Sequence, residues 1–110
     1  MAKPIIAIVG LGWIGCSMGK ALKKAGGNFE IVGHDREPGA NNVAKKYNAV
    51  DRTSWNLISA VEQADLVLLA IPVSALYDTL KAIGPELKQN CLVLDTCAVK
   101  APALAWADEL

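Results

Sequence analysis

The first fifteen residues constrain the fold of this chain more than any other segment. Residues 5–9 read Ile-Ile-Ala-Ile-Val, an apolar run with four β-branched members, which is typical of a strand buried on both faces. Residues 10–15, here named the glycine loop, read Gly-Leu-Gly-Trp-Ile-Gly and match the spacing G-x-G-x-x-G. This pattern predicts a tight turn from a strand into a helix whose N-terminus binds a dinucleotide pyrophosphate.

Each glycine of the loop has its own expected role. Gly10 lets the chain turn out of the strand, Gly12 lets a phosphate approach the backbone, and Gly15 lets the helix pack close to the strand. The helix N-terminus adds unpaired N–H groups and the positive end of its dipole. The expected cofactor contacts in the loop are Gly10, Leu11, Gly12, Trp13, Ile14 and Gly15. Trp13 either covers the pyrophosphate or nicotinamide, or is an exposed aromatic that meets another domain.

A second strand and an acidic residue follow at the expected distance. The helix after the loop is expected to end at Gly26, and the apolar run 29–32 predicts the second strand. Asp35 comes twenty residues after Gly15, where a carboxylate can accept hydrogen bonds from the adenosine ribose. The apolar stripe expected on the helix consists of Ile14, Met18, Ala21, Leu22 and Ala25.

The residues at the end of this second strand bear on the choice of coenzyme. Asp35 favours NAD, because the 2′-phosphate of NADP would meet a like charge. Arg36 either stacks on adenine, pairs with a 2′-phosphate or is a solvated surface residue, so NADP remains an alternative. His34 is expected to be a packing residue or a contact near the adenosine, and not a catalytic base.

Strands and helices alternate along the rest of the chain. Apolar strands between amphipathic helices predict a parallel sheet covered on both faces, a Rossmann-type doubly wound α/β fold with strand order 3-2-1-4-5. Further strands are expected at 66–71 and 91–94, with a short connection or brief strand at 48–50. Helices are expected from Pro38 to about Tyr47, after an N-cap at Ser54, after an N-cap at Ser74, and from Pro102. The aromatic residues Tyr47, Trp55, Tyr77 and Trp106 are expected on packing faces.

The carboxyl ends of the strands should form one crevice at the edge of the sheet. The glycine loop, Asp35 and Arg36 would hold the ADP half of the cofactor. The loops after the fourth and fifth strands lie where a nicotinamide would reach. The residues expected there are Ala70, Ile71, Pro72, Val73 and Thr96.

Composition narrows the partners and the compartment. The chain of 110 residues has eleven basic and eleven acidic residues and a formal net charge of zero, so nothing favours a nucleic acid or an anionic membrane as partner. Its three cysteines form no C-x-x-C pair, which predicts neither a metal cluster nor a disulfide framework. With no signal or membrane segment in the pattern, we expect a cytoplasmic protein.

Four segments together resemble one enzyme family. Residues 10–17 (GLGWIGCS) are similar to the G-L-G-L-I-G-G-S opening of prephenate and arogenate dehydrogenases, and residues 32–36 (VGHDR) to their V-I-G-Y-D-R. Residues 69–73 (LAIPV) are similar to L-A-V-P-V, and residues 93–100 (VLDTCAVK) to V-T-D-V-G-S-V-K. The segments come in the family's order and spacing, and the likeness covers nearly the whole chain.

The resemblance implies an NAD(P)-dependent oxidative decarboxylation of prephenate or arogenate, a step in tyrosine biosynthesis. It also implies a catalytic histidine beyond the V-K segment, an assisting serine, and a helical C-terminal domain for substrate binding and dimerisation. Here Ala98 stands at the serine position, and the 110 residues contain neither that histidine nor that domain. Residues 1–110 are therefore expected to form a dinucleotide-binding domain that is inactive alone.

Two other functions remain open at this point. One is a stand-alone nucleotide-binding or regulatory module without catalysis, which Ala98 favours. The other is a related Rossmann dehydrogenase that acts on another hydroxy acid or an imine. An uncovered apolar sheet edge and the helix face of Leu104, Ala107 and Leu110 predict a homo-oligomer in each case.

Overall fold

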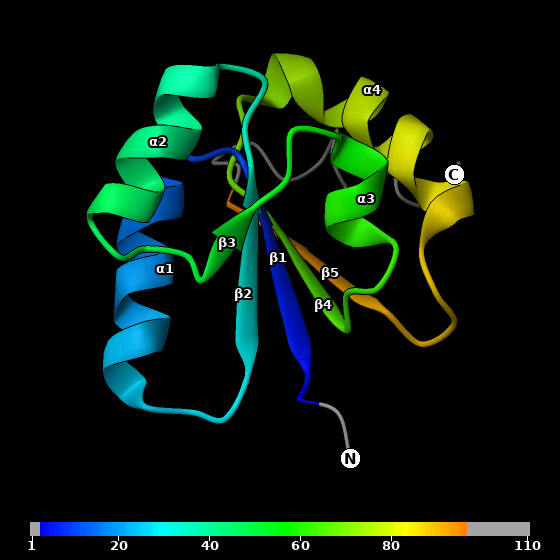
Figure 1. Ribbon diagram of the computed structural model, residues 1–110. Helices are drawn as coiled ribbons and strands as arrows, with labels where there is room; N and C mark the ends of the chain where they lie inside the picture. The colour runs from blue at the N-terminus through cyan, green and yellow to red at the C-terminus, as the bar shows by residue number, and fades with distance from the viewer. Residues whose placement is uncertain (1–2, 97–110) are drawn as a thin grey trace.

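The computed structural model describes residues 3–96 and contains one parallel sheet with helices on both faces (Figure 1). The strand order is β3-β2-β1-β4-β5, which confirms the predicted topology. Every pairing between neighbouring strands is parallel. The strands are β1 (Ile5–Val9), β2 (Glu30–His34), β3 (Arg52–Thr53), β4 (Leu66–Leu69) and β5 (Leu92–Asp95).

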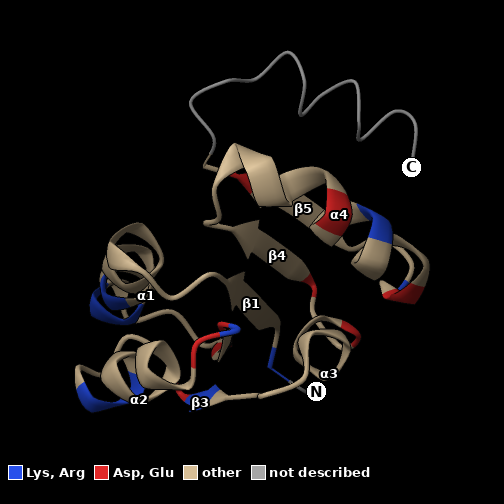
Figure 2. Ribbon diagram, turned by 90° about the horizontal axis from the view of Figure 1, so that it is seen from above, with Lys and Arg blue, Asp and Glu red and all other residues tan. Residues whose placement is uncertain are grey.

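Two helices cover each face of the sheet, as the view from above shows (Figure 2). Helices α1 (Trp13–Ala25) and α2 (Pro38–Lys46) lie on one side, and α3 (Leu57–Val61) and α4 (Val73–Ile83) on the other. A short 3₁₀ turn, η1 (Gly84–Glu86), follows α4. None of the helices in the described range is long and apolar enough to cross a membrane.

The central strand β1 divides the hydrophobic core into two layers. Ile6 and Ile8 belong to the cluster with α1 and α2, whereas Ala7 and Val9 belong to the cluster with α3 and α4. Both layers exclude solvent from β1, because Ala7 on one face and Ile8 on the other are fully buried. This two-sided burial is what the unbroken apolar run predicted.

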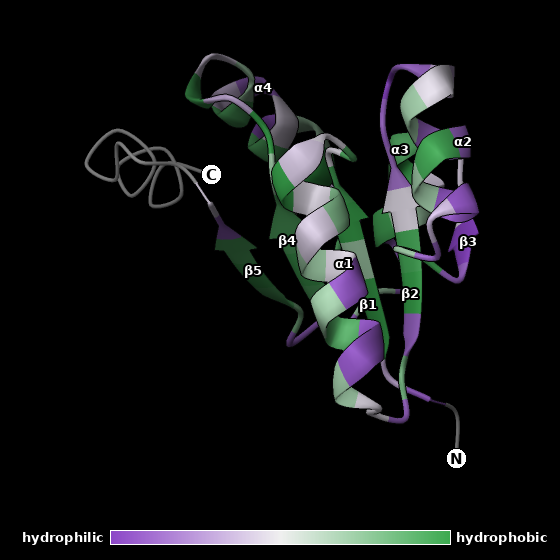
Figure 3. Ribbon diagram, turned by 90° about the vertical axis from the view of Figure 1, so that its left-hand side faces the viewer, coloured by the Kyte–Doolittle hydropathy of each residue, from purple (hydrophilic) through white to green (hydrophobic). Residues whose placement is uncertain are grey.

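Among residues 3–96, the edge strand β5 is covered on one face only. Val93 packs against the cluster beneath α3 and α4. Leu92 and Leu94 are 67% and 56% exposed and pair in register with Leu66 and Leu68, which face α1 and α2. Figure 3 shows β5 as a hydrophobic strand set apart from α1. The expectation of an uncovered apolar strand at the sheet edge therefore holds for these two leucines.

Helix α1 packs through only part of the predicted stripe, Met18 and Leu22. Ile14 is 50% exposed, and Ala21 and Ala25 are also exposed. The buried residues of α1 are Gly15 and Gly19. A Cβ on Gly19 would lie 2.1 Å from the carbonyl oxygen of Ala49, so two glycines set the distance of closest approach. Met18 and Leu22 pack against the same core layer.

Several predicted element ends were wrong by a few residues. The side chain of Asn56, not Ser54, caps α3 by accepting a hydrogen bond from the Ser59 N–H. Helix α4 has Pro72 at its N-cap in place of Ser74. Strand β3 lies at 52–53 and not at 48–50, β4 ends at Leu69, and β2 and β5 begin and end later than expected.

Two of the aromatic residues predicted to pack are instead exposed. Trp55 is 87% exposed in the loop before α3, and Tyr47 is 56% exposed at the end of α2. Lys20 lies over the Tyr47 ring at 5.8 Å from its centroid. Tyr77 is half-buried on α4, and Trp106 lies outside the described residues, as does the helix expected from Pro102.

Two aspartates at the amino edge of the sheet each accept a hydrogen bond from the beginning of a neighbouring strand. Asp51, just before β3, accepts a hydrogen bond from the Ile31 N–H and pairs with Lys23. Asp65, just before β4, accepts one from the Ile5 N–H and pairs with Lys88. The lysine hydrogen bond is the main cause that lowers the pKa of each aspartate below its ordinary value, and the backbone hydrogen bond adds to it.

Candidate functional site

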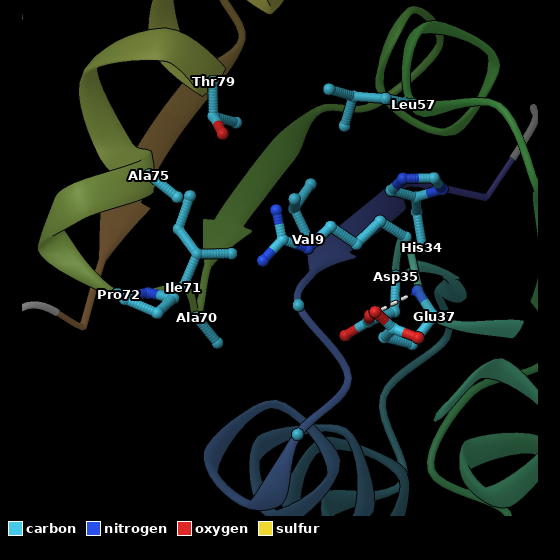
Figure 4. A pocket seen from close by; sticks show the side chains of 13 residues that line it. Val9, His34, Asp35, Glu37, Leu57, Ala70, Ile71, Pro72, Ala75 and Thr79 are labelled. Carbon is cyan, nitrogen blue, oxygen red and sulfur yellow. Dashed lines mark hydrogen bonds between the residues drawn. The ribbon is translucent and has the colours of Figure 1, made fainter. Parts of the chain in front are cut away.

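A cavity of about 390 Å³ opens at the carboxyl ends of β1, β2 and β4 (Figure 4). This is the edge of a parallel sheet where ligands bind in doubly wound folds. Seven of the residues predicted from the sequence line it: Gly10, Gly12, Asp35, Arg36, Ala70, Ile71 and Pro72. The cavity therefore brings together the glycine loop, the acidic end of β2 and the loop after β4.

Gly10 makes the turn out of β1 in a conformation that favours glycine. Its φ is +98°, and its N–H donates to the His34 carbonyl at 2.8 Å. A Cβ at this position would lie 2.3 Å from the carbonyl oxygen of Ala70. Gly10 is thus enclosed between the ends of β2 and β4, and both its φ and its surroundings exclude a larger residue.

Gly12 and Gly15 differ in what surrounds them. A Cβ on Gly15 would lie 1.9 Å from the Gly10 carbonyl oxygen, so this glycine lets α1 approach the strand. A Cβ on Gly12 would meet no atom within 4 Å. Gly12 is the N-cap of α1 and lines the cavity, so the space beside it is open at the positive end of a helix.

The carboxylate of Asp35 joins the end of β2 to the glycine loop. Its Oδ2 accepts a hydrogen bond from the Leu11 N–H at 2.7 Å, and its Oδ1 accepts one from the Glu37 N–H at 2.9 Å. The Cys16 thiol donates to the Leu11 carbonyl at 3.3 Å. Both backbone groups of Leu11 are therefore held, and burial, with a further contribution from Asp35, raises the pKa of the Cys16 thiol.

Asn41, which sequence reasoning did not assign to the site, supports Asp35. Asn41 on α2 accepts from the Asp35 N–H at 3.0 Å and donates to the Asp35 carbonyl at 2.9 Å. His34 is buried, and its Nδ1 lies 2.8 Å from the Ser54 carbonyl oxygen. His34 also lines the cavity. Its burial confirms the packing role expected of it, and the contact near the adenosine stays a prediction.

The wall opposite Asp35 also escaped sequence reasoning. Leu57 at the start of α3 faces Ala75 and Thr79 of α4 across the cavity (Figure 4). The i, i+4 spacing of Ala75 and Thr79 was the available signal, because it places both on one face of the helix. This wall supplies a mostly apolar surface with a single hydroxyl group.

Some predicted site residues lie away from the cavity. The Thr96 N–H and hydroxyl both donate to the Leu69 carbonyl, at 3.1 and 3.3 Å. Val73, the first residue of α4, is partly buried and packs against the core. Trp13 is 87% exposed and lines a second hollow of about 540 Å³ between α1 and α2, as does Leu11. Ala98 lies outside the described residues.

No group of histidine, cysteine, aspartate or glutamate side chains within residues 3–96 could hold a metal ion. Cys16 and Cys91 are both free thiols. The chemical character of the site is that of a cradle for an anion beside a carboxylate, with an apolar wall opposite.

Comparison with known proteins identifies relatives for this fold and site. The family described as "Prephenate dehydrogenase, nucleotide-binding domain" matches residues 18–109. Prephenate dehydrogenase of Lactococcus lactis subsp. cremoris is 37% identical over 106 residues, which are 96% of this chain and 29% of that protein. Cyclohexadienyl dehydrogenase of Zymomonas mobilis is 34% identical over 99 residues, covering 90% and 34%. The chain thus spans about a third of the length of these relatives.

Solved structures share this fold. Synechocystis arogenate dehydrogenase superposes with a TM-score of 0.87 at 27% identity, over 96% of this chain and 37% of that one. Prephenate dehydrogenase from A. aeolicus, solved with hydroxyphenyl propionate and NAD⁺, gives a TM-score of 0.90 at 24% identity, covering 99% and 38%. Because the family match extends over most of the sequence, the chain belongs to the family of prephenate dehydrogenase nucleotide-binding domains.

Proposed function

We propose that residues 1–110 form the NAD-binding domain of an enzyme that oxidatively decarboxylates prephenate or arogenate. The observation that carries this proposal is the open space beside Gly12, at the N-terminus of α1 and next to the Asp35 carboxylate. The pyrophosphate would bind to the N–H groups of residues 12–14, and the adenosine ribose to Asp35. The A. aeolicus relative was solved with NAD⁺, which supports the same ligand here.

The chain's own residues would bind and orient the cofactor. Leu57, Ala75 and Thr79 would contact the adenine, with Arg36 closing the same side of the cavity. Pro72 and Ile71 would lie toward the nicotinamide half. NAD, when bound, accepts a hydride from the substrate. The groups that hold and activate the substrate would come from a further domain, in the same polypeptide or in another.

We also propose NAD over NADP, a homo-oligomeric state and a cytoplasmic location. The carboxylate of Asp35 disfavours a 2′-phosphate. The exposed leucines of β5 supply an apolar surface for association. The free thiols Cys16 and Cys91 support a reducing compartment.

Calorimetric titration of NAD, and then of NADP, into the purified chain tests the binding proposal. Gly12→Ala should keep the wild-type melting temperature, because its Cβ meets no atom, and should lower NAD affinity at least about tenfold by filling the phosphate position. Gly84→Ala is the matched control, since its Cβ also meets open space and lies outside the cavity. Equal NAD affinity in both variants would contradict the proposed cradle.

A domain exchange tests the reaction. This chain would replace the corresponding segment of the Lactococcus lactis prephenate dehydrogenase, and NADH formation would be measured with prephenate and with arogenate. Activity that Gly12→Ala abolishes supports the enzyme. A chimera that binds NAD but oxidises neither substrate favours a binding module without catalysis.

A further inference from the structure

Asn41 holds the backbone of Asp35 on both sides. Its Oδ1 accepts a hydrogen bond from the Asp35 N–H at 3.0 Å, and its Nδ2 donates to the Asp35 carbonyl at 2.9 Å. Asn41 is half-buried on α2, whereas Asn42 beside it is exposed. One side chain thus fixes the orientation of the peptide groups on either side of residue 35.

The held residue in turn fixes the glycine loop. The Asp35 Oδ2 accepts from the Leu11 N–H at 2.7 Å, across 24 residues of sequence, and the Oδ1 accepts from the Glu37 N–H at 2.9 Å. An ionised carboxylate makes such hydrogen bonds stronger than neutral acceptors do. A continuous path of hydrogen bonds, the Asn41–Asp35–Leu11 chain, therefore links α2 to the loop after β1.

We propose that Asn41 is a positioning residue for the dinucleotide, and that it acts through Asp35 to hold both the ribose acceptor and the glycine loop in their binding geometry. This inference rests on the proposed NAD-binding function. A carboxylate has about four acceptor positions, and the two backbone N–H groups use one on each oxygen. Among the described residues, these contacts leave one position on each oxygen, which matches the two hydroxyl groups of a ribose.

The arrangement gives Asp35 two separable contributions to binding. Its free acceptor positions bind the ribose directly, and its contact with Leu11 orders the loop before the ligand arrives. Ordering a loop in advance lowers the entropy cost of binding. A ligand without ribose hydroxyls loses the first contribution but still benefits from the second.

Amide hydrogen exchange measured by NMR tests the Asn41–Asp35–Leu11 chain without any ligand. In Asn41→Ala, exchange of the Leu11 N–H should accelerate about tenfold or more, while the Val67 N–H in β4 keeps its wild-type rate. Asn42→Ala is the matched control and should leave Leu11 unchanged. Asn41→Asp keeps the size of the side chain and the acceptor for the Asp35 N–H but loses the donor, and it should also accelerate exchange at Leu11.

Ligand titration tests the consequence for binding. NAD affinity should fall about tenfold in Asn41→Ala and stay at the wild-type value in Asn42→Ala, since two hydrogen bonds that hold the site are lost. The probe for loop ordering is 2′,3′-dideoxy-ADP, which has no ribose hydroxyl to offer. Asp35→Ala should weaken binding of this probe as well as binding of NAD.

The outcomes separate this inference from the proposed function. If both Asn41 variants leave Leu11 exchange and NAD affinity equal to those of Asn42→Ala, the positioning role is overturned. If Asp35→Ala weakens NAD but not the dideoxy probe, the loop-ordering part is overturned. If wild-type protein binds neither ligand, the proposed function fails, and this role for Asn41 fails with it even where Leu11 exchange shows that the hydrogen-bond chain exists.

Discussion

Helix α1 and the loop after α2 approach each other closely at Gly19. The contacts around Gly19 allow us to work out how its replacement by alanine changes the free energy of unfolding. A Cβ on Gly19 would lie 2.1 Å from the Ala49 carbonyl oxygen, 3.0 Å from its carbon and 3.3 Å from the Ile8 Cδ1. Ordinary contact begins near 3.4 Å, so Gly19→Ala requires the helix and this loop to separate by more than 1 Å. Ala49 is fully buried and its N–H donates to the Ala44 carbonyl, which limits its movement.

Two opposing effects set the size of the change. Alanine inside a helix is favoured over glycine by about 0.5–1 kcal/mol. Overpacking that forces a backbone shift costs about 1–3 kcal/mol, and sometimes more. Because the neighbour of Gly19 is backbone and not a flexible side chain end, we expect a net loss of about 1–2 kcal/mol in the free energy of unfolding, which corresponds to a melting temperature about 5–10 °C lower.

Urea denaturation followed by circular dichroism measures this difference. Gly39→Ala is the matched control, because Gly39 is also helical, lies on the neighbouring helix α2, and would meet no atom with an added Cβ. It should be as stable as wild type or up to about 1 kcal/mol more stable. If Gly19→Ala matches or exceeds Gly39→Ala in stability, the packing argument for α1 is refuted.

Three further outcomes are expected. Because their folded-state pKa values are lowered, Asp51 and Asp65 contribute stability above the ordinary carboxyl pKa of about 3.9, and this contribution is lost as pH falls through the lower folded-state values. Urea midpoints between pH 7 and pH 2 should therefore fall less steeply in Asp51→Asn than in wild type. Leu94→Lys should reduce self-association in sedimentation velocity runs at high concentration, and a wild type that stays monomeric there would contradict a β5 interface. NAD should quench tryptophan fluorescence through Trp13, which is exposed beside Gly12, and quenching that persists in Trp13→Phe would place the responsible tryptophan elsewhere.

Short-range sequence patterns predicted the fold because each one has a local physical cause. The apolar run at 5–9 predicts a strand buried on both faces, because its consecutive apolar side chains point alternately to either face. The structure buries residues 6–9 of this strand. Gly10 and Gly15 follow from steric needs at a strand-to-helix turn, and both would clash with an added Cβ. Asp35 follows from its place at the end of the second strand.

Contacts between distant segments escaped prediction. Gly19 is required by the carbonyl of Ala49, thirty residues away, and nothing near it in the sequence signals that approach. Asn41 lies in a helix beside a second asparagine, and only the fold shows which of the two reaches Asp35. Ser54 and Asn56 are both residues that often cap helices. The sequence alone could not show which of them caps α3, because that depends on where the helix begins after β3.

Mapping NAD binding by NMR tests the central claim most directly, which is that the glycine loop and the end of β2 form one dinucleotide site. We expect saturable amide shifts confined to residues 10–15, to Asp35 and Arg36, and to Ala70 and Ile71, with little change at Leu92 on the far strand. No shifts at millimolar NAD, or shifts centred on the hollow between α1 and α2 while Asp35 stays unchanged, would contradict it.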